Sequence, residues 1–213
     1  IIFDLLSITT TGQVVILDVD ASCAKIDFTL LANPLIIDFR RDLNVSFEAN
    51  LHPNLTCTRN NSFSAIYFVT DSTNGIFNPA DASLDLGFIF IGATLTDTLT
   101  LTSNLDLGNF GVFIISKGTF ISEAAELIAN SFNLFTDNPK NIFLNSTFLS
   151  LYSGVDARFL TNTTFDAGTS NIFIEGSLGN DYFYGNGFNY HNLEINHVAS
   201  TTFLSGSNTF NKL

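Results

Sequence analysis

The chain has 213 residues, enough for one sizeable core, and 46% of them are hydrophobic whereas only 13% are charged. Its 20 acidic and 8 basic residues give a formal net charge of −12, which argues against nucleic acid and against a membrane surface as partners. No apolar run reaches the roughly 18 residues of a membrane-spanning helix, and no linker composition divides the chain, so we expect residues 1–213 to form a single domain.

Strand-sized apolar segments recur along the whole chain. Each is rich in Phe, Ile, Thr and Val, has a period near two, and is bounded by Asn, Gly, Asp, Ser or Pro, which is the pattern of β-strands. In chain order the segments read VVILDV, KIDFTL, PLIIDF, NVSFEA, AIYFV, LDLGFIFIG, TLTLTSNLDL, FGVFII, NIFLN, TFLSLY, NIFIEG and NLEIN. We therefore predict an all-β fold.

One segment has the composition of a helix. It reads SEAAELIANSF over residues 122–132, but the Ser at its start is not followed three residues later by Glu, which makes a weak helix start. We predict at most one short helix here. The part ELIANSF fits a strand equally well, because Phe132, Leu134 and Phe135 continue the apolar run.

Periodicity alone leaves open a β-sandwich, a closed barrel or a solenoid, and internal repetition favours the solenoid. Thr147, Thr164 and Thr202 each stand in a Ser/Thr-Thr-Phe triplet, 17 and 38 residues apart. These distances are near one and two turns of a parallel β-helix with roughly 20 residues in each coil. Phe side chains at equivalent points would then stack in the interior, which accounts for 23 Phe and no Trp.

We therefore predict a right-handed parallel β-helix or a closely related β-solenoid, with a β-sandwich as the alternative. Phe, Ile, Leu and Val are expected inside, and Asn, Thr, Ser and Asp outside. The two cysteines, Cys23 and Cys57, fit either a single disulfide or two small buried side chains.

The ends of the chain predict a fragment of a larger protein. The chain has no Met and begins at Ile1. Its final segment, Gly206 to Leu213, looks like a rung without a cap, and the end of a solenoid needs a cover. We expect contact there with flanking domains of the same protein or self-association with a second protomer.

Three stretches have a sequence pattern like that of extracellular repeat proteins. They read VVILDVDASCAKIDFT, ATLTDTLTLTSNLDLGNFG, and FYGNGFNYHNLEI together with FLSGSNTFNKL. On these motifs the chain resembles the parallel β-helix repeat regions of secreted bacterial adhesins, notably those of Bacteroidetes, and tail-fibre-like proteins of environmental phages. The resemblance implies an extracellular, cell-surface or virion location.

A glycine-rich segment over residues 176–187, GSLGNDYFYGNG, is similar to the calcium-binding nonapeptide of RTX proteins. Its turns would expose backbone carbonyls, and Asp181 beside Gly179 would supply a carboxylate, a hard-oxygen site suited to calcium. RTX calcium is shared between stacked copies, however, and the following GNGFNYHNL lacks both the Gly and the Asp of a second copy. Calcium is therefore a possible cofactor. The alternative is that the segment is a plain glycine-rich turn.

Two further carboxylates suggest an enzymatic alternative. Asp18 and Asp20 would lie on one face of a strand, with Asp27 and Asp38 on strands nearby. Parallel β-helix lyases bind calcium through such acidic clusters, and glycosidases of similar fold use paired carboxylates. Only Lys25 accompanies these acids, and no nucleophile or phosphate-binding motif occurs, so no catalytic residue is assigned.

Aromatic residues are concentrated near the C-terminal end. Tyr182, Tyr184 and Tyr190 stand among Gly and Asn, and exposed Tyr rings beside amides are suited to hold sugars. If Phe183 points inward, Tyr182 and Tyr184 form the surface pair. We therefore expect a structural or adhesive surface module rather than an enzyme, with glycans or a protein surface as ligand. A polysaccharide lyase or hydrolase and a calcium-stabilised secreted module are the alternatives.

Overall fold

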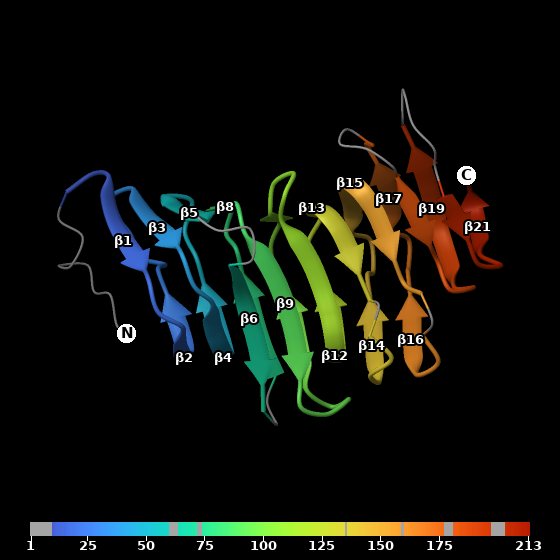
Figure 1. Ribbon diagram of the computed structural model, residues 1–213, viewed down its shortest axis with the longest axis horizontal. Coiled ribbons are helices and arrows are strands. Elements are labelled where there is room, and N and C mark those ends of the chain that lie inside the picture. The colour runs from blue at the N-terminus through green and yellow to red at the C-terminus, as the bar shows by residue number, and fades with distance from the viewer. Residues whose placement is uncertain are drawn as a thin grey trace.

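The computed structural model describes residues 10–59, 64–71, 74–134, 136–158, 160–176, 181–196 and 203–213, without the side chains of 203–205. Every strand pairing in these residues is parallel, and the strands stack into a solenoid of about eight turns. The rungs follow one another along the long axis of Figure 1, from β1 at one end to β21 at the other. The predicted parallel β-solenoid is therefore confirmed.

The strands are β1 (Gln13–Leu17), β2 (Ala21–Asp27), β3 (Leu35–Phe39), β4 (Leu43–Asn50), β5 (Leu55–Arg59), β6 (Ala65–Thr70), β7 (Asn74–Asn78), β8 (Ser83–Leu84), β9 (Gly87–Gly92), β10 (Thr98–Leu101), β11 (Leu105–Asp106), β12 (Val112–Ser122), β13 (Glu126–Asn133), β14 (Lys140–Phe143), β15 (Phe148–Asp156), β16 (Thr163–Asp166), β17 (Asn171–Ile174), β18 (Tyr182–Tyr184), β19 (Asn189–Ile195), β20 (Phe203–Ser205) and β21 (Thr209–Lys212).

The strands form three ladders of hydrogen-bonded rungs. The first ladder runs β2–β4–β6–β9–β12–β13–β15–β18–β20. The second uses the C-terminal halves of β2 and β4 and continues through β7, β10, β12, β14 and β16. The third contains β1–β3–β5–β8 and, farther on, β11–β13–β15–β17–β19–β21. A long strand such as β12 bends from one ladder into the next.

The interior is a column of stacked apolar side chains, because alternate residues of every rung point the same way. Phe88, Phe113 and Phe132 are in direct register on the first ladder and are almost inaccessible. Their ring centroids lie 5.0 Å and 5.6 Å apart with interplanar angles of 3° and 7°. The predicted Phe stack is therefore present, and it stabilises the fold through burial and offset stacking.

The segment with helical composition is a strand. β13 begins at Glu126, and its residues alternate between buried and partly exposed. It pairs with both β12 and β15, so the sheet decides its conformation. Of the two predicted possibilities for this segment the strand is confirmed; no helix occurs in the described residues, which agrees with the prediction of at most one short helix. Consequently no helix in that part of the chain could cross a membrane.

The repeat register predicted from the Thr-Phe triplets is wrong where it can be checked. Thr147 is buried in the turn before β15, where its hydroxyl bonds to Ser122 Oγ at 2.6 Å and to the Ala124 carbonyl at 2.9 Å. Thr164 lies on β16 in register with Asn141 of the second ladder. The two triplets thus occupy different sides of the solenoid, while Thr202 lies outside the described residues.

The two cysteines are not bridged. Cys23 lies on the first ladder and Cys57 on the third, and both thiols are free. Burial raises the pKa of the Cys57 thiol to about 12 and also raises that of Cys23. Both behave as small apolar side chains of the core rather than as reactive thiols.

Candidate ligand-binding surface

The outward residues of β18 form the aromatic part of the candidate site. Phe183 is fully buried in register with Val155, so its neighbours Tyr182 and Tyr184 point outward and are half-buried. Their ring centroids are 5.5 Å apart and their planes differ by 20°. The period of a strand therefore places these two tyrosines side by side on the outside, as the sequence predicts.

The backbone of Tyr182 lies directly against a glycine of the preceding rung. Gly154 is the register partner of Tyr182 and has a φ of +143°. A Cβ atom there would come within 1.8 Å of the Tyr182 carbonyl oxygen, so only glycine fits at this position. The Tyr182 side chain hydrogen-bonds to Ser131, which pairs with Gly154 from the rung before it and is only 2% exposed.

An arginine completes the cluster. Arg158 follows β15, and its guanidinium carbon lies 4.3 Å from the centre of the Tyr184 ring. Asp156, the register partner of Tyr184, holds the guanidinium with two bonds: Nε donates to Oδ1 at 2.9 Å and a terminal nitrogen donates to Oδ2 at 2.6 Å. Such a bidentate pair fixes the plane of the guanidinium against the ring.

The electrostatics of the cluster keep its groups in one protonation state. Hydrogen bonding to Asp156 holds the pKa of Arg158 above its usual value, so the guanidinium stays charged. Burial, above all, raises the pKa of Tyr182, so its hydroxyl stays neutral and remains a donor as well as an acceptor. The cluster therefore offers a cation, the neutral hydroxyl of Tyr182 and aromatic carbon on one rigid surface.

Tyr190 does not belong to this surface. Its side chain is 4% exposed, its hydroxyl donates to the Gly185 carbonyl at 3.0 Å, and its ring lies edge-on to Phe183 at 4.8 Å. Burial raises the pKa of the Tyr190 hydroxyl. The turn at Gly185 changes which residues of the following strand face inward, so the expected exposure of Tyr190 is wrong.

The predicted calcium segment falls partly outside the described residues, because Gly179 lies there. Asp181 is described and is 1% exposed, just before β18. Within the described chain, no group of three or more His, Cys, Asp or Glu side chains is arranged to hold a metal ion. Calcium binding by Asp181 and Gly179 stays a prediction.

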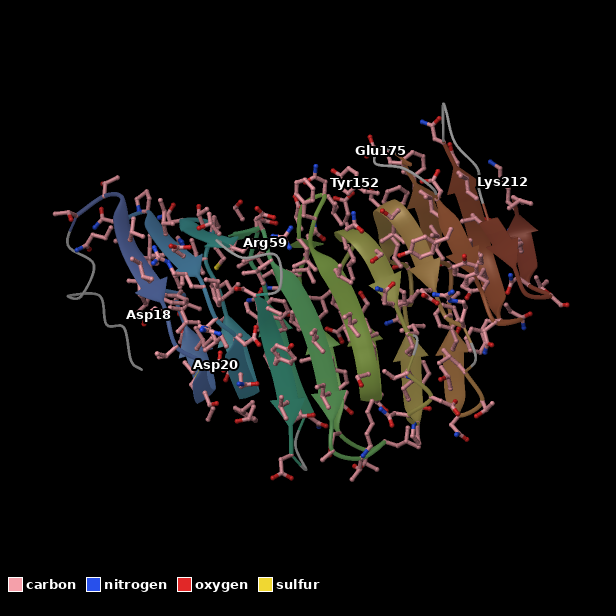
Figure 2. The ribbon with its side chains drawn as sticks, in the orientation of Figure 1. Asp18, Asp20, Arg59, Tyr152, Glu175 and Lys212 are labelled. Atoms are coloured by element: carbon pink, nitrogen blue, oxygen red, sulfur yellow. The ribbon has the colours of Figure 1, made fainter. Side chains whose placement is uncertain are left out.

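Asp18 and Asp20, the two acidic residues on which the enzymatic alternative depends, do not share one strand face. β1 ends at Leu17, so Asp18 and Asp20 lie in a turn rather than on one strand face, at the N-terminal end of the solenoid in Figure 2. Asp20 accepts a bond from the Asp42 amide at 3.3 Å.

The other two acids of that group have local partners. Asp27 accepts the Thr29 hydroxyl at 2.6 Å and lies 3.3 Å from Lys25, and Asp38 bonds to Arg40 at 3.0 Å. Asp20, Asp27 and Asp38 therefore each have a local structural contact, and the expected shared strand face of Asp18 and Asp20 is wrong.

Sequence reasoning missed the residues that complete the aromatic site. Asp156, Arg158 and Ser131 precede Tyr182 by 24 to 51 positions, and the register of the coils brings them to the same place. The only feature of the sequence that points to these residues is the short spacing of Asp156 and Arg158. That spacing suits a local ion pair, but it does not indicate that the pair lies beside the tyrosines.

Comparisons with known proteins found no match for the chain. No family model, no curated protein and no solved structure matches it.

Proposed function

We propose that the chain is a rigid structural module of an extracellular, cell-surface or virion protein, and that it binds glycans through the Tyr182–Tyr184–Arg158 cluster. The observation that carries this proposal is the half-exposed tyrosine pair stacked beside a guanidinium whose plane is fixed by Asp156. The resemblance to adhesin and tail-fibre repeat regions agrees with such a role.

The rigidity of the site supports recognition rather than catalysis. β18 has a hydrogen-bonded neighbour on each side, β15 and β20, so the tyrosine backbones cannot shift without breaking the ladder. Preorganised side chains lose little conformational entropy when a ligand binds. A saccharide presents C–H groups and hydroxyls together, which match tyrosine rings and the donors of Arg158.

The test is a binding measurement on a panel of neutral and acidic oligosaccharides, with titration calorimetry of any ligand found. Replacing Tyr184→Ala removes the ring that touches both Tyr182 and Arg158, and we expect about a tenfold loss of affinity. Replacing Tyr184→Phe keeps the ring and should retain most of the affinity.

Tyr152→Ala is the matched control. Tyr152 lies at the bend of β15, between the residues that pair with β17 and those that pair with β18, and Figure 2 places it near Glu175. Its replacement should leave glycan binding unchanged. Equal losses from Tyr152→Ala and Tyr184→Ala, or no binding across the panel, would contradict the proposed site.

The same panel addresses the two alternatives. Release of shortened or unsaturated products from a polysaccharide would mean that the chain is a lyase or hydrolase. A fall in melting temperature on adding a chelator would support the calcium-stabilised module, because a metal that binds only the folded state stabilises it.

A further inference from the structure

The charge of Arg158 is balanced inside the tyrosine cluster. Its Nε donates to one oxygen of Asp156 at 2.9 Å and its Nη2 donates to the other at 2.6 Å, so both oxygens of the carboxylate are occupied. The Asp156 side chain is 11% exposed, whereas the Arg158 side chain is 46% exposed. The carboxylate therefore lies deeper than the guanidinium, and the pair presents a polar surface that has no net charge.

The donors that remain on Arg158 suit uncharged acceptors. Its Nε side is held by Asp156, and the N–H groups of Nη1 have no acceptor among the described residues. A sugar hydroxyl or ring oxygen accepts from such a donor without bringing a charge. A ligand carboxylate at the same place would bring a second anion close to the Asp156 carboxylate, and the repulsion would offset much of its attraction to the guanidinium.

The surroundings of the cluster also disfavour an anion. From the start of β15 to the end of β18, residues 148–184, the chain contains one basic residue, which is Arg158 itself. The same stretch contains four acidic residues, Asp156, Asp166, Glu175 and Asp181. The whole chain has a net charge of −12, so its field repels acidic ligands at longer range as well.

We propose that this site binds neutral saccharides and discriminates against acidic ones, and that Asp156 sets this selectivity. The inference rests on the proposed glycan-binding function and names the class of glycan. Tyr182 and Tyr184 supply rings for the C–H groups of a sugar, and Arg158 supplies donors for its hydroxyls. Glucose, galactose and mannose fit this chemistry, whereas uronic acids and sulfated sugars add a charge that the site does not neutralise.

The selectivity should depend on ionic strength, because salt screens charges at a protein surface. A neutral sugar has no charge to be screened, so its affinity should stay constant between about 0.02 M and about 0.5 M salt. The affinity of an acidic sugar should rise over the same range, and the ratio of the neutral to the acidic affinity should therefore become smaller.

Titration calorimetry with matched pairs of saccharides tests the proposal. The neutral members are trisaccharides of glucose, of galactose and of mannose, and each acidic partner carries the corresponding uronic acid as its non-reducing sugar. The wild-type chain is expected to bind at least one neutral trisaccharide about tenfold more tightly than its acidic partner at low salt. This comparison does not depend on the folding of any variant.

Asp156→Asn tests the role of Asp156. Asparagine has nearly the same shape and keeps one oxygen that accepts from Arg158, but it leaves the charge of the guanidinium unbalanced. The ratio of the neutral to the acidic affinity should therefore fall about tenfold. The ratio is the quantity to measure, because any loss of order in Arg158 lowers both affinities together.

Asp38→Asn is the matched control. Asp38 and Arg40 form an ion pair with the same spacing in the sequence: Nε of Arg40 lies 3.0 Å from Oδ2 of Asp38, and the Arg40 side chain is likewise 46% exposed. The pair lies at the end of β3, and its replacement removes one negative charge from the chain without touching the tyrosines. The affinity ratio should stay at the wild-type value. A melting curve for each variant establishes that it is folded.

The possible failures can be told apart. Absence of binding to every trisaccharide, neutral and acidic, would contradict the glycan-binding function and this inference with it. An acidic trisaccharide that the wild-type chain binds at least as tightly as its neutral partner would overturn the selectivity and leave the glycan site standing. An unchanged ratio in Asp156→Asn, or an equal fall in Asp38→Asn, would overturn the role of Asp156.

Discussion

The first coil and the later coils contain similar apolar residues but bury them to different degrees. In β1 and β2 the inward side chains Val15, Leu17 and Cys23 are only partly buried and line an apolar cavity. In the later coils Phe113 and Phe132 are almost inaccessible. The reason is stacking: within the part of the chain that the structure describes, β1 pairs with β3 alone and β2 with β4 alone, whereas β12 and β13 have rungs on both sides.

A coil of this protein therefore does not make its own core. A strand buries its inward residues only when neighbouring rungs cover them, so stability is a property of contacts between coils. Substitutions of the same kind should have larger effects on the free energy of unfolding in the later coils than in the first.

The largest effect is expected from Phe113→Ala. It removes the central ring of the Phe88–Phe113–Phe132 stack and leaves a cavity that the ladders cannot close, which costs about 3–5 kcal/mol of the free energy of unfolding. The same substitution at two leucines compares the coils directly: Leu149→Ala on β15, which has rungs on both sides, should cost about 3 kcal/mol, whereas Leu17→Ala on β1, beside an existing cavity, should cost about 1 kcal/mol. Urea unfolding of these variants measures the difference, and equal losses from the two leucine replacements would contradict the comparison.

A smaller loss in the free energy of unfolding is expected when a glycine with positive φ is replaced by alanine. Gly154→Ala would bring a Cβ atom against the Tyr182 backbone and should cost about 3 kcal/mol. Gly12, in the first coil, has a φ of +76° and no atom within 4 Å of such a Cβ. Gly12→Ala should therefore cost only about 1 kcal/mol, from the backbone conformation alone. Thermal unfolding checks both variants, and a more damaging Gly12→Ala would be inconsistent with this view.

The smallest effect concerns two lysines and depends on pH. Lys140 on β14 points inward and is 0% exposed, and its Nζ donates to the Thr136 carbonyl. Burial lowers the pKa of Lys140 to about 8 from its ordinary 10.5. Between these values the unfolded chain binds the proton more readily than the folded chain, so the free energy of unfolding should rise with pH across this range.

Lys140→Met should remove this rise, which urea unfolding from pH 7 to pH 11 would reveal as a flatter profile. Lys25 of the first coil is the control, because it is exposed and lies 3.1 Å from Glu48 and 3.3 Å from Asp27. Hydrogen bonds to these carboxylates raise the pKa of Lys25, so its contribution to stability is lost, not gained, at high pH. A rise that persists in Lys140→Met would disprove the assignment.

Only some residues of the candidate site could be predicted from the sequence. Tyr182 and Tyr184 follow from strand alternation around Phe183, because one inward residue determines its neighbours. Tyr190 could not be assigned, because the turn at Gly185 separates it from that alternation. Arg158 could not be assigned either, because only the register of β15 against β18 brings it to Tyr184.

The class of fold follows from the amino-acid sequence: short strands of period two, few charges and many Phe require an extended sheet with an apolar interior. The register of the coils does not follow from the sequence, because coil length varies. Phe113 pairs with Phe132, 19 residues later, whereas Gly154 pairs with Tyr182, 28 residues later. The turns between rungs tolerate insertions at little energetic cost, so a fixed spacing could not align the coils. Which outward residues meet on one face is a consequence of that register.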